Sequence, residues 1–123
     1  MSKKKILIVE DESVLRDVYK LILSKDDAYD VIEAKNGLEG LEKLKKHLPD
    51  LVLLDLFMPV MDGISFLQNF DRDDHADIKI IVYSNMSDDA TVKEAKFLGA
   101  DDFVLKSSFN PTQLLELVEN TLK

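Results

Sequence analysis

Short, mostly apolar runs that recur along the chain constrain its fold more than any other feature. Each run is rich in Val, Ile and Leu and is followed by a polar residue; the runs occupy residues 6–9, 51–54, 78–83 and 103–105. Runs of this kind are typical of buried parallel strands. Because ligands of an open α/β sheet bind just beyond the carboxyl ends of its strands, we expect the polar residues that follow the runs to meet in one crevice.

These polar residues have complementary chemistry. They are Glu10 and Asp11 after the first run, Asp55 after the second, Ser84 after the third and Lys106 after the fourth. Three acids at close range favour a cation, since carboxylates otherwise repel one another. Oxygen ligands suit Mg²⁺, which binds one or two carboxylates together with phosphate. An aspartate beside such an ion can act as a nucleophile and form an aspartyl phosphate.

The hydroxyl and the amine fit the same chemistry. Lys106 and the metal would stabilise charge on a transferring phosphoryl group, and Ser84 would hydrogen-bond one of its oxygens. Taken alone, each residue has a plainer explanation: Asp11 as a helix cap, Asp55 as a turn residue, Ser84 as a loop hydroxyl and Lys106 as a surface charge. Their joint placement at the ends of four predicted strands favours phosphoryl chemistry.

Strands and helices are predicted to alternate along the chain. The expected strands are residues 5–10, 31–34, a strand running into Asp55, 78–84 and 102–106. Apolar residues at helical spacing predict inward faces of Val14, Leu15, Val18, Leu21 and Ile22 in the first helix and Leu38, Leu41, Leu44 and Leu48 in the second. A third helix is expected at 64–70, and further core candidates are Phe66, Phe70, Phe97 and Leu98.

Capping residues place the remaining helices. Pro49 is expected to end the second helix, Ser87 to cap the fourth and Gly99 to follow the end of the fourth. Asn110, Pro111 and Gln113 have the pattern of a capping box that opens the fifth helix. Five strand–helix units predict one α/β domain over residues 1–123, a doubly wound parallel sheet with about five helices.

Bulk properties narrow the class of protein. A chain of 123 residues with no cysteine and no membrane-length apolar run predicts a soluble, cytoplasmic protein without disulfides. The net charge of −8 gives this domain no electrostatic footprint for nucleic acid. His47 and His75 lack partners at metal-ligand spacing, so we expect structural roles for both.

The motifs around these residues resemble those of the response-regulator receiver domain, the phospho-acceptor module of two-component signalling. The resemblance covers essentially the whole chain. It is carried by residues 8–12 (IVEDE), 54–63 (LDLFMPVMDG), 83–84 (YS) and 99–106 (GADDFVLK). The second segment is the most specific, and the others support it at the correct spacing. The resemblance implies a flavodoxin-like fold with strand order 2-1-3-4-5.

The resemblance also implies a role for each site residue. Asp55 would be the phosphorylation site, with Mg²⁺ held by Asp11, by Glu10 directly or through water, and by the backbone carbonyl of Phe57. Lys106 would pair with Asp55 or its phosphate. Ser84 would be the switch hydroxyl, and its movement would change the rotamer of Phe103.

The implied partners are a histidine kinase or phosphotransfer protein and a downstream protein or output domain. The output surface would be the fourth helix, fifth strand and fifth helix, which also mediates phosphorylation-dependent dimers in many relatives. On the fourth helix, Thr91, Ala95 and Leu98 are the expected inward positions. Val92 and Lys96 would then face outward and, with Phe103, form the interface.

Some positions depart from the family pattern. Ser107 follows Lys106 where the family usually has proline, and Asn85 follows Ser84 where a small residue is usual. Phe57 and Met86 flank the expected crevice, and we hypothesise that they shield the acyl phosphate from water; local packing explains both equally well.

Other functions were compared with a phosphorylation switch, which would turn over no external substrate. A haloacid-dehalogenase-like phosphatase would need an acid two residues after the nucleophile, where this chain has Phe57. A flavin-binding domain would need phosphate donors in the first loop, which is acidic here. A degenerate receiver that binds partners without phosphorylation remains open because of Ser107 and Asn85.

Overall fold

The structure is a computed structural model that describes residues 3–25, 27–85, 88–106 and 110–123. Its five strands form one parallel sheet in the order β2-β1-β3-β4-β5. The strands are β1 (Lys4–Val9), β2 (Tyr29–Ala34), β3 (Leu51–Asp55), β4 (Lys79–Ser84) and β5 (Asp102–Leu105). The predicted fold class and strand order are therefore confirmed, with β2 starting earlier than its sequence pattern indicated.

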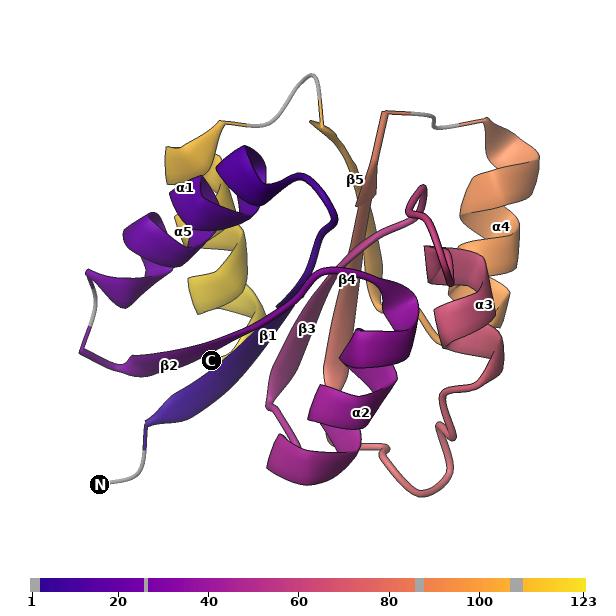
Figure 1. Cartoon of the computed structure of the whole chain (residues 1–123), viewed down its shortest axis with the longest axis horizontal. Coiled ribbons are helices and arrows are strands. Elements are labelled where there is room, and N and C mark those ends of the chain that lie inside the picture. The colour runs from indigo at the N-terminus through magenta and orange to yellow at the C-terminus, as the bar shows by residue number, and fades with distance from the viewer. Residues whose placement is uncertain (1–2, 26, 86–87, 107–109) are drawn as a thin grey trace.

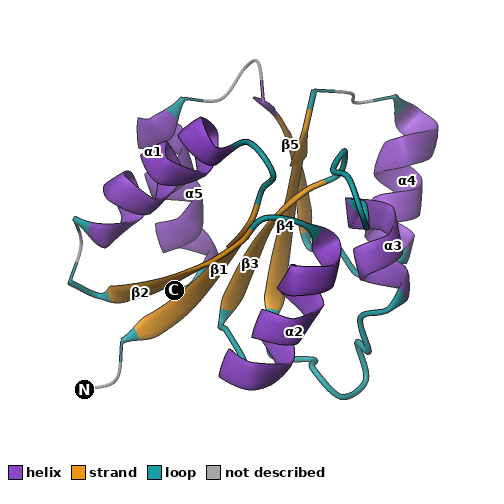
Figure 2. Ribbon diagram, viewed as in Figure 1, coloured by secondary structure: helices purple, strands orange, loops and turns teal. Residues whose placement is uncertain are grey.

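The helices cover both faces of this sheet, as Figures 1 and 2 show. α1 and α5 lie on one face, and α2, α3 and α4 lie on the other. Their bounds are α1 (Ser13–Ser24), α2 (Gly37–His47), α3 (Gly63–Gln68), α4 (Asp89–Phe97) and α5 (Pro111–Thr121). Two hydrophobic cores result, one on each face.

Strand alternation divides the apolar residues between these two cores. In β1, Ile6 and Ile8 face α1 and α5, whereas Leu7 and Val9 face the other helices. All four side chains are fully buried, because both faces of a central parallel strand are covered. The same alternation continues past the last apolar residue of a strand and decides on which side of the sheet a polar residue emerges.

The predicted inward face of α1 was wrong in part. Val14 is 77% exposed and Leu21 is 62% exposed, and Val18 is also exposed. The helix instead buries Tyr19 and Leu23. With the partly buried Leu15, they form a row with a spacing of four residues. The buried row is the one that carries Tyr19, because this ring packs edge-on against Tyr83 of β4.

Two other predicted core positions also lie at the surface. Leu38 and Leu48 of the expected α2 stripe are exposed, and Leu48 has left the helix for a left-handed conformation at φ 47°. Phe97 is 89% exposed, because Ala95 is the residue that α4 buries against the sheet. Phe66 and Phe70 are buried as expected.

The helix ends follow the predicted capping chemistry with one change. Asn110 and Gln113 form the expected capping box at α5, and Gly99 follows α4 with φ 120°, a conformation that glycine adopts readily. The cap of α4 is Asp88, whose side chain accepts a hydrogen bond from the Thr91 N–H. The predicted cap, Ser87, lies outside the described residues.

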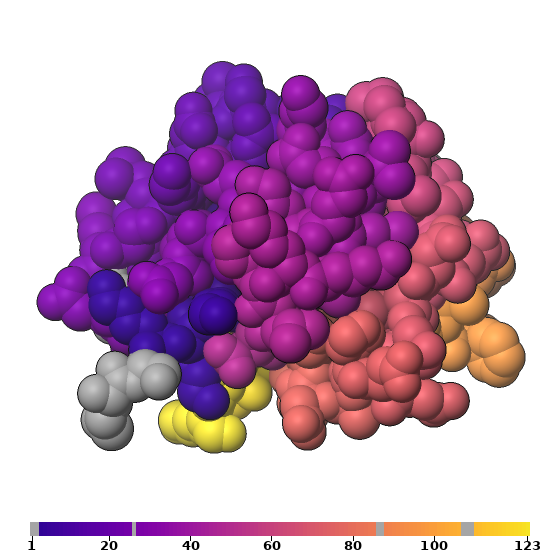
Figure 3. Space-filling model, turned by 60° about the horizontal axis from the view of Figure 1, so that its bottom comes forward, coloured from indigo at the N-terminus to yellow at the C-terminus, as the bar shows by residue number. Residues whose placement is uncertain are grey.

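The amino ends of the strands are held by a guanidinium clamp. Arg72 donates to the Ile78 carbonyl over 2.6 Å and to Asp101 Oδ1 over 2.8 Å, while Asp101 Oδ2 accepts from the Ile80 N–H. The segment between α3 and β4 that carries Arg72 lies at the surface shown in Figure 3. No helix among the described residues is long and apolar enough to cross a membrane.

Candidate functional site

The parallel register brings the predicted site residues to one edge of the sheet. Glu10 directly follows β1, Asp55 and Ser84 end β3 and β4, and Lys106 directly follows β5. Glu10, Asp55 and Ser84 are the buried polar or charged residues of the described chain. Lys106 is also largely covered, with 11% of its side chain exposed.

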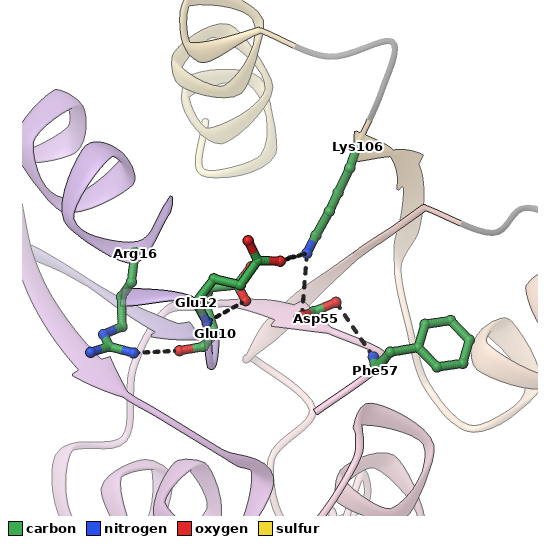
Figure 4. Close-up of polar contacts among 6 residues, drawn as sticks. All are labelled: Glu10, Glu12, Arg16, Asp55, Phe57 and Lys106. Carbon is green, nitrogen blue, oxygen red and sulfur yellow. Dashed lines mark hydrogen bonds and ion pairs between the residues drawn. The ribbon is translucent and has the colours of Figure 1, made fainter. Parts of the chain in front are cut away.

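One ammonium group serves several carboxylates at this edge. Lys106 Nζ lies 3.1 Å from Glu10 Oε1 and 3.3 Å from Asp55 Oδ2, and 3.8 Å from the exposed carboxylate of Glu12. Figure 4 shows the lysine reaching across from the end of β5 to these acids. Two almost fully buried carboxylates thus share a single cation, which leaves the cluster with excess negative charge.

This imbalance shifts the titration of the cluster. Burial, followed by repulsion from Glu10, raises the pKa of Asp55 to about 7, although Lys106 pulls it down. For Lys106 itself, burial lowers the pKa, but attraction to Asp55 and Glu10 outweighs it, so the net pKa is raised. Lys106 is therefore a cation at neutral pH, and additional positive charge near Asp55 would favour its ionised form.

The acids have the arrangement that a hard cation requires. One carboxylate oxygen each from Glu10, Asp11 and Asp55 lies within 4.8 Å of the other two, and Asp11 is only half-buried. An all-oxygen donor set with an open side suits Mg²⁺, which keeps several of its waters. The residues present therefore fit the metal that the sequence predicted.

Backbone contacts fix the position of Glu10. Its Oε2 accepts from the Glu12 N–H over 3.0 Å, and its carbonyl accepts from Arg16 Nη1 over 2.6 Å (Figure 4). Arg16 also lies 3.6 Å from Glu33 of β2. Sequence analysis missed Arg16, because nothing in the residues around it indicates that its side chain returns to the Glu10 carbonyl.

The loop after β3 holds Asp55 from the other side. The Phe57 N–H donates to Asp55 Oδ1 over 3.4 Å, and the Gly63 N–H donates to the Leu56 carbonyl. A Cβ at Gly63 would lie 2.5 Å from the Asp55 carbonyl oxygen, so the chain can return this closely only with glycine there. The Phe57 side chain is 54% exposed at the rim of the site. Metal binding by the Phe57 carbonyl stays a prediction.

The expected switch residues occupy suitable positions. Ser84 is fully buried at the end of β4, and Phe103 is half-buried against the core beneath α2, α3 and α4. Asn85 is exposed beside the site. Met86 and Ser107, two of the family departures, lie outside the described residues. The switching roles of Ser84 and Phe103 stay predictions.

The expected interface on α4 is only partly outward. Ala95 is buried and Thr91 and Leu98 are half-buried, as predicted, and Lys96 is exposed. Val92 was expected to face outward but is half-buried. The short α4 lies on the edge of the sheet formed by β5, so residues on its flank are partly covered.

Two tyrosines that sequence analysis did not assign to the site lie against it. Tyr83, next to Ser84 in β4, is 1% exposed, and the Lys106 ammonium sits 5.1 Å from the centre of its ring. Tyr19 of α1 packs edge-on against Tyr83, with ring centres 5.6 Å apart. Tyr83 is part of an apolar strand run, so the sequence indicated only a core residue.

Comparison with known proteins places this arrangement in a family. Residues 6–119 match the response regulator receiver domain. The chain is 42% identical to the chemotaxis protein CheY of Bacillus subtilis over 96% of this chain and 97% of that protein. It is 37% identical to the probable transcriptional regulator ycf27 of Porphyridium aerugineum over its full length, but this match spans only 50% of that longer protein.

The fold has close counterparts among solved structures. A CheY-like response regulator receiver domain protein from Methanospirillum hungatei superposes with a TM-score of 0.89 at 30% identity, covering 98% of this chain and 94% of that one. The beryllofluoride-activated DrrB receiver domain superposes with a TM-score of 0.85 at 26% identity, with 98% of each chain covered.

Proposed function

Because the chain belongs to the response regulator receiver family, we propose that it is a phosphorylation-controlled signalling switch whose acceptor is Asp55. The observation that carries the proposal is the pairing of a nearly fully buried Asp55 carboxylate with the Lys106 ammonium at 3.3 Å, beside two further acids that complete a cation site. A structural ion pair would not need the additional carboxylates, whose repulsion destabilises the fold.

The proposed reaction is phosphoryl transfer to a carboxylate oxygen of Asp55. That oxygen attacks phosphorus, an O–P bond forms, the P–N bond of a phosphohistidine donor breaks, and the released imidazole takes a proton from water. Glu10, Asp11 and Asp55 would hold Mg²⁺, which supplies positive charge against the phosphoryl oxygens. The Lys106 ammonium, 3.3 Å from Asp55 Oδ2, would stabilise the same charge.

Phosphorylation would change the charge balance on which the site depends. The phosphoryl oxygens compete with Glu10 for the Lys106 ammonium, and they offer an acceptor to the Ser84 hydroxyl. Both contacts favour one arrangement of the β4 and β5 ends over the other, which shifts a two-state equilibrium. This protein would thus catalyse its own phosphorylation and dephosphorylation and turn over no external substrate.

The partners proposed are a histidine kinase or phosphotransfer protein as donor and a downstream protein or output domain as receiver of the signal. The B. subtilis CheY match covers nearly all of both proteins, whereas the ycf27 match covers half of the longer one. The proposed output surface is the α4–β5–α5 face, with Val92, Lys96 and Phe103 as contacts. Cytoplasmic location and phosphorylation-dependent dimerisation stay predictions.

The test is incubation with Mg²⁺ and acetyl phosphate, followed by intact mass measurement. We expect the mass of one phosphoryl group to be added, and expect it to be absent without Mg²⁺ and in Asp55→Asn. Asp30→Asn is the matched control, because Asp30 is an exposed aspartate of β2 paired with Lys3 far from this cluster. Absence of any addition to the wild type, even with a cognate kinase, would support a phosphorylation-independent interaction module instead.

The output surface needs a separate test. Val92→Ala and Lys96→Ala should weaken a phosphorylation-dependent partner interaction or dimer without changing phosphoryl uptake. Sedimentation of the phosphorylated protein and its variants measures the dimer directly. Full retention of every phosphorylation-dependent interaction in both variants would exclude these two residues from the interface.

A further inference from the structure

The Tyr83 side chain lies on the same side of the sheet as the acids. Strand alternation places Ile81 and Tyr83 of β4 in the core under α1 and α5, together with Leu53 of β3. Two residues beyond Leu53, Asp55 emerges on that side as well, since side chains alternate along a strand. The Lys106 ammonium therefore lies over the face of the Tyr83 ring, 5.1 Å from the ring centre.

The Tyr83 hydroxyl is at present unsatisfied. In the part of the chain that the structure describes, the buried side-chain atoms without a hydrogen bond are Tyr83 Oη and Glu10 Oε1. Buried polar atoms nearly always find partners, because an unmet hydrogen bond costs free energy. Glu10 Oε1 is compensated by its ion pair with Lys106, whereas the phenol lies near the Glu10 side chain without meeting it in hydrogen-bond geometry.

The electrostatics of the cluster keep this phenol a donor. Burial, followed by the negative charges of Glu10 and Asp55, raises the pKa of Tyr83 well above its ordinary value. The geometry places Tyr83 in the same neighbourhood, because the Lys106 ammonium lies 5.1 Å from the Tyr83 ring centre and 3.1 Å from Glu10 Oε1. The neutral Tyr83 phenol near Glu10 is therefore an unused hydrogen-bond donor. Its prospective acceptor, the Glu10 carboxylate, is paired with Lys106 in this structure.

We propose that Tyr83 is a positioning residue for this site, whose ring seats the Lys106 ammonium and whose hydroxyl donates to Glu10 once Lys106 turns to the phosphoryl group. The ring's part rests on the contacts above alone. The hydroxyl's part rests on the proposed function. Without that donor, the fully buried Glu10 would lose its Lys106 contact with no replacement at Oε1, which is costly for a carboxylate even when a metal ion shares its charge.

The alternative is that Tyr83 only fills the core. A core-filling tyrosine with an unpaired buried hydroxyl should tolerate phenylalanine without loss, because the substitution keeps the ring and removes an unsatisfied group. Tyr83→Phe thus separates the hydroxyl from the ring. Tyr19→Phe is the matched control, since it removes a phenol from the ring that packs edge-on against Tyr83.

The ring contact is tested in metal-free, unphosphorylated protein by NMR. A side chain above an aromatic face experiences a ring-current shift, so the Lys106 Hε protons should resonate upfield in wild type, Tyr83→Phe and Tyr19→Phe. They should return to ordinary positions in Tyr83→Leu, or in Tyr83→Met if the leucine variant does not fold. An unchanged Hε shift in the folded leucine or methionine variant would overturn the ring's part.

The hydroxyl is tested with beryllofluoride, a phosphoryl mimic, by calorimetric titration at saturating Mg²⁺. We expect Tyr83→Phe to bind beryllofluoride about tenfold more weakly, as for a lost hydrogen bond to a charged group. Its affinity for Mg²⁺ alone should change less than about twofold, because Lys106 still pairs with Glu10 in that state. Tyr19→Phe should match the wild type in both.

These measurements distinguish a failure of the Tyr83 hydroxyl's role from a failure of the proposed phosphorylation switch. Equal beryllofluoride affinity in Tyr83→Phe and wild type would overturn the hydroxyl's part, and so would equal losses in beryllofluoride and Mg²⁺ affinity, which indicate a general structural defect. A wild-type protein that binds Mg²⁺ but no beryllofluoride contradicts the proposed function and, with it, the hydroxyl's part. The proton shift of Lys106 still decides the ring's part in that case.

Discussion

The two ends of the sheet use paired charges in opposite ways: the pair at the amino end is partly exposed, and the cluster at the carboxyl end is largely buried. At the amino end, the Arg72 guanidinium meets one carboxylate, Asp101, and both groups complete their hydrogen bonds with backbone atoms of the β4 region. At the carboxyl end, the Lys106 ammonium is divided among Glu10, Asp55 and Glu12. The first arrangement is balanced and stabilises the fold, whereas the second is short of positive charge, as the proposed magnesium site requires.

This contrast shows what separates a structural ion pair from a functional one. A paired charge whose remaining hydrogen bonds are satisfied gains nothing from a new ligand. A cluster with excess charge binds a cation, because the cation removes repulsion that the fold otherwise carries. Substitutions at the two ends should therefore affect different properties, stability at one end and phosphoryl chemistry at the other.

The largest expected effect is at Lys106. Lys106→Met removes the only ammonium paired with the buried acids among the described residues. Phosphoryl uptake from acetyl phosphate should slow by about a hundredfold, in the range found when a charge-stabilising group is removed. Quenched time points analysed by intact mass measure this rate. An uptake within a few-fold of wild type would show that Lys106 does not stabilise the transferring group.

At the opposite end, the expected effect is on stability alone. Asp101→Asn removes the negative charge that pairs with Arg72 and weakens the hydrogen bond that the side chain accepts from the Ile80 N–H. The free energy of unfolding should fall by about 2 kcal/mol. Urea denaturation followed by circular dichroism measures it. Phosphoryl uptake by the folded variant should stay at the wild-type rate; a large loss of uptake would mean that the two ends are not independent.

A smaller effect of opposite sign is expected for Asp55→Asn in metal-free buffer. Folding raises the Asp55 pKa from 3.8 to about 7, so the native state holds this proton more tightly than the unfolded state does. Asp55 therefore lowers stability as pH rises from about 4 through about 7. The asparagine variant should be more stable than wild type by about 1–3 kcal/mol at pH 7.5.

The pH dependence supplies the control for this comparison. The difference between Asp55→Asn and wild type should shrink towards zero near pH 4, where the carboxyl group is neutral in both states. Urea midpoints collected with EDTA between pH 4 and 8 measure it. A difference that stays constant over this range would show that the substitution acts through packing and not through charge.

The smallest expected effect is at Phe57, whose half-exposed ring lies at the rim. If the ring limits water access, Phe57→Asn should shorten the half-life of the aspartyl phosphate by about two- to fivefold, corresponding to about 0.4–1 kcal/mol. Decay after removal of the phosphodonor, followed by intact mass, measures it. An unchanged half-life would leave local packing as the explanation for this residue.

The sequence predicted that Asp55 and Lys106 would lie together, for a physical reason. Asp55 and Lys106 follow apolar runs, and parallel strands bring such positions to one edge whatever the details of the loops. Arg16 and Tyr83 were missed because their roles depend on distances between elements. The phenol within a buried strand and the guanidinium on a helix carry no local signal of what they contact.

The error on α1 has the same origin. Val14, Val18 and Leu21 share one flank of the helix, and Leu15, Tyr19 and Leu23 share the neighbouring one. Apolar periodicity alone favoured the first, but the structure chose the second because Tyr19 packs against Tyr83 of the sheet. Which flank is buried was decided by a tertiary contact that no sequence window contains.

The position of Arg16 has a consequence for the outermost strand. Its guanidinium donates to the Glu10 carbonyl and pairs with Glu33 of β2. The Glu10 N–H donates to the Ala34 carbonyl, also of β2. Both backbone groups of Glu10 are therefore held by β2, one directly and one through Arg16. β2 supplies no ligand and no reacting atom, and it borders only β1. Redesign or permutation at this margin, where changes are usually harmless, would nevertheless loosen Glu10, the first of the proposed metal ligands.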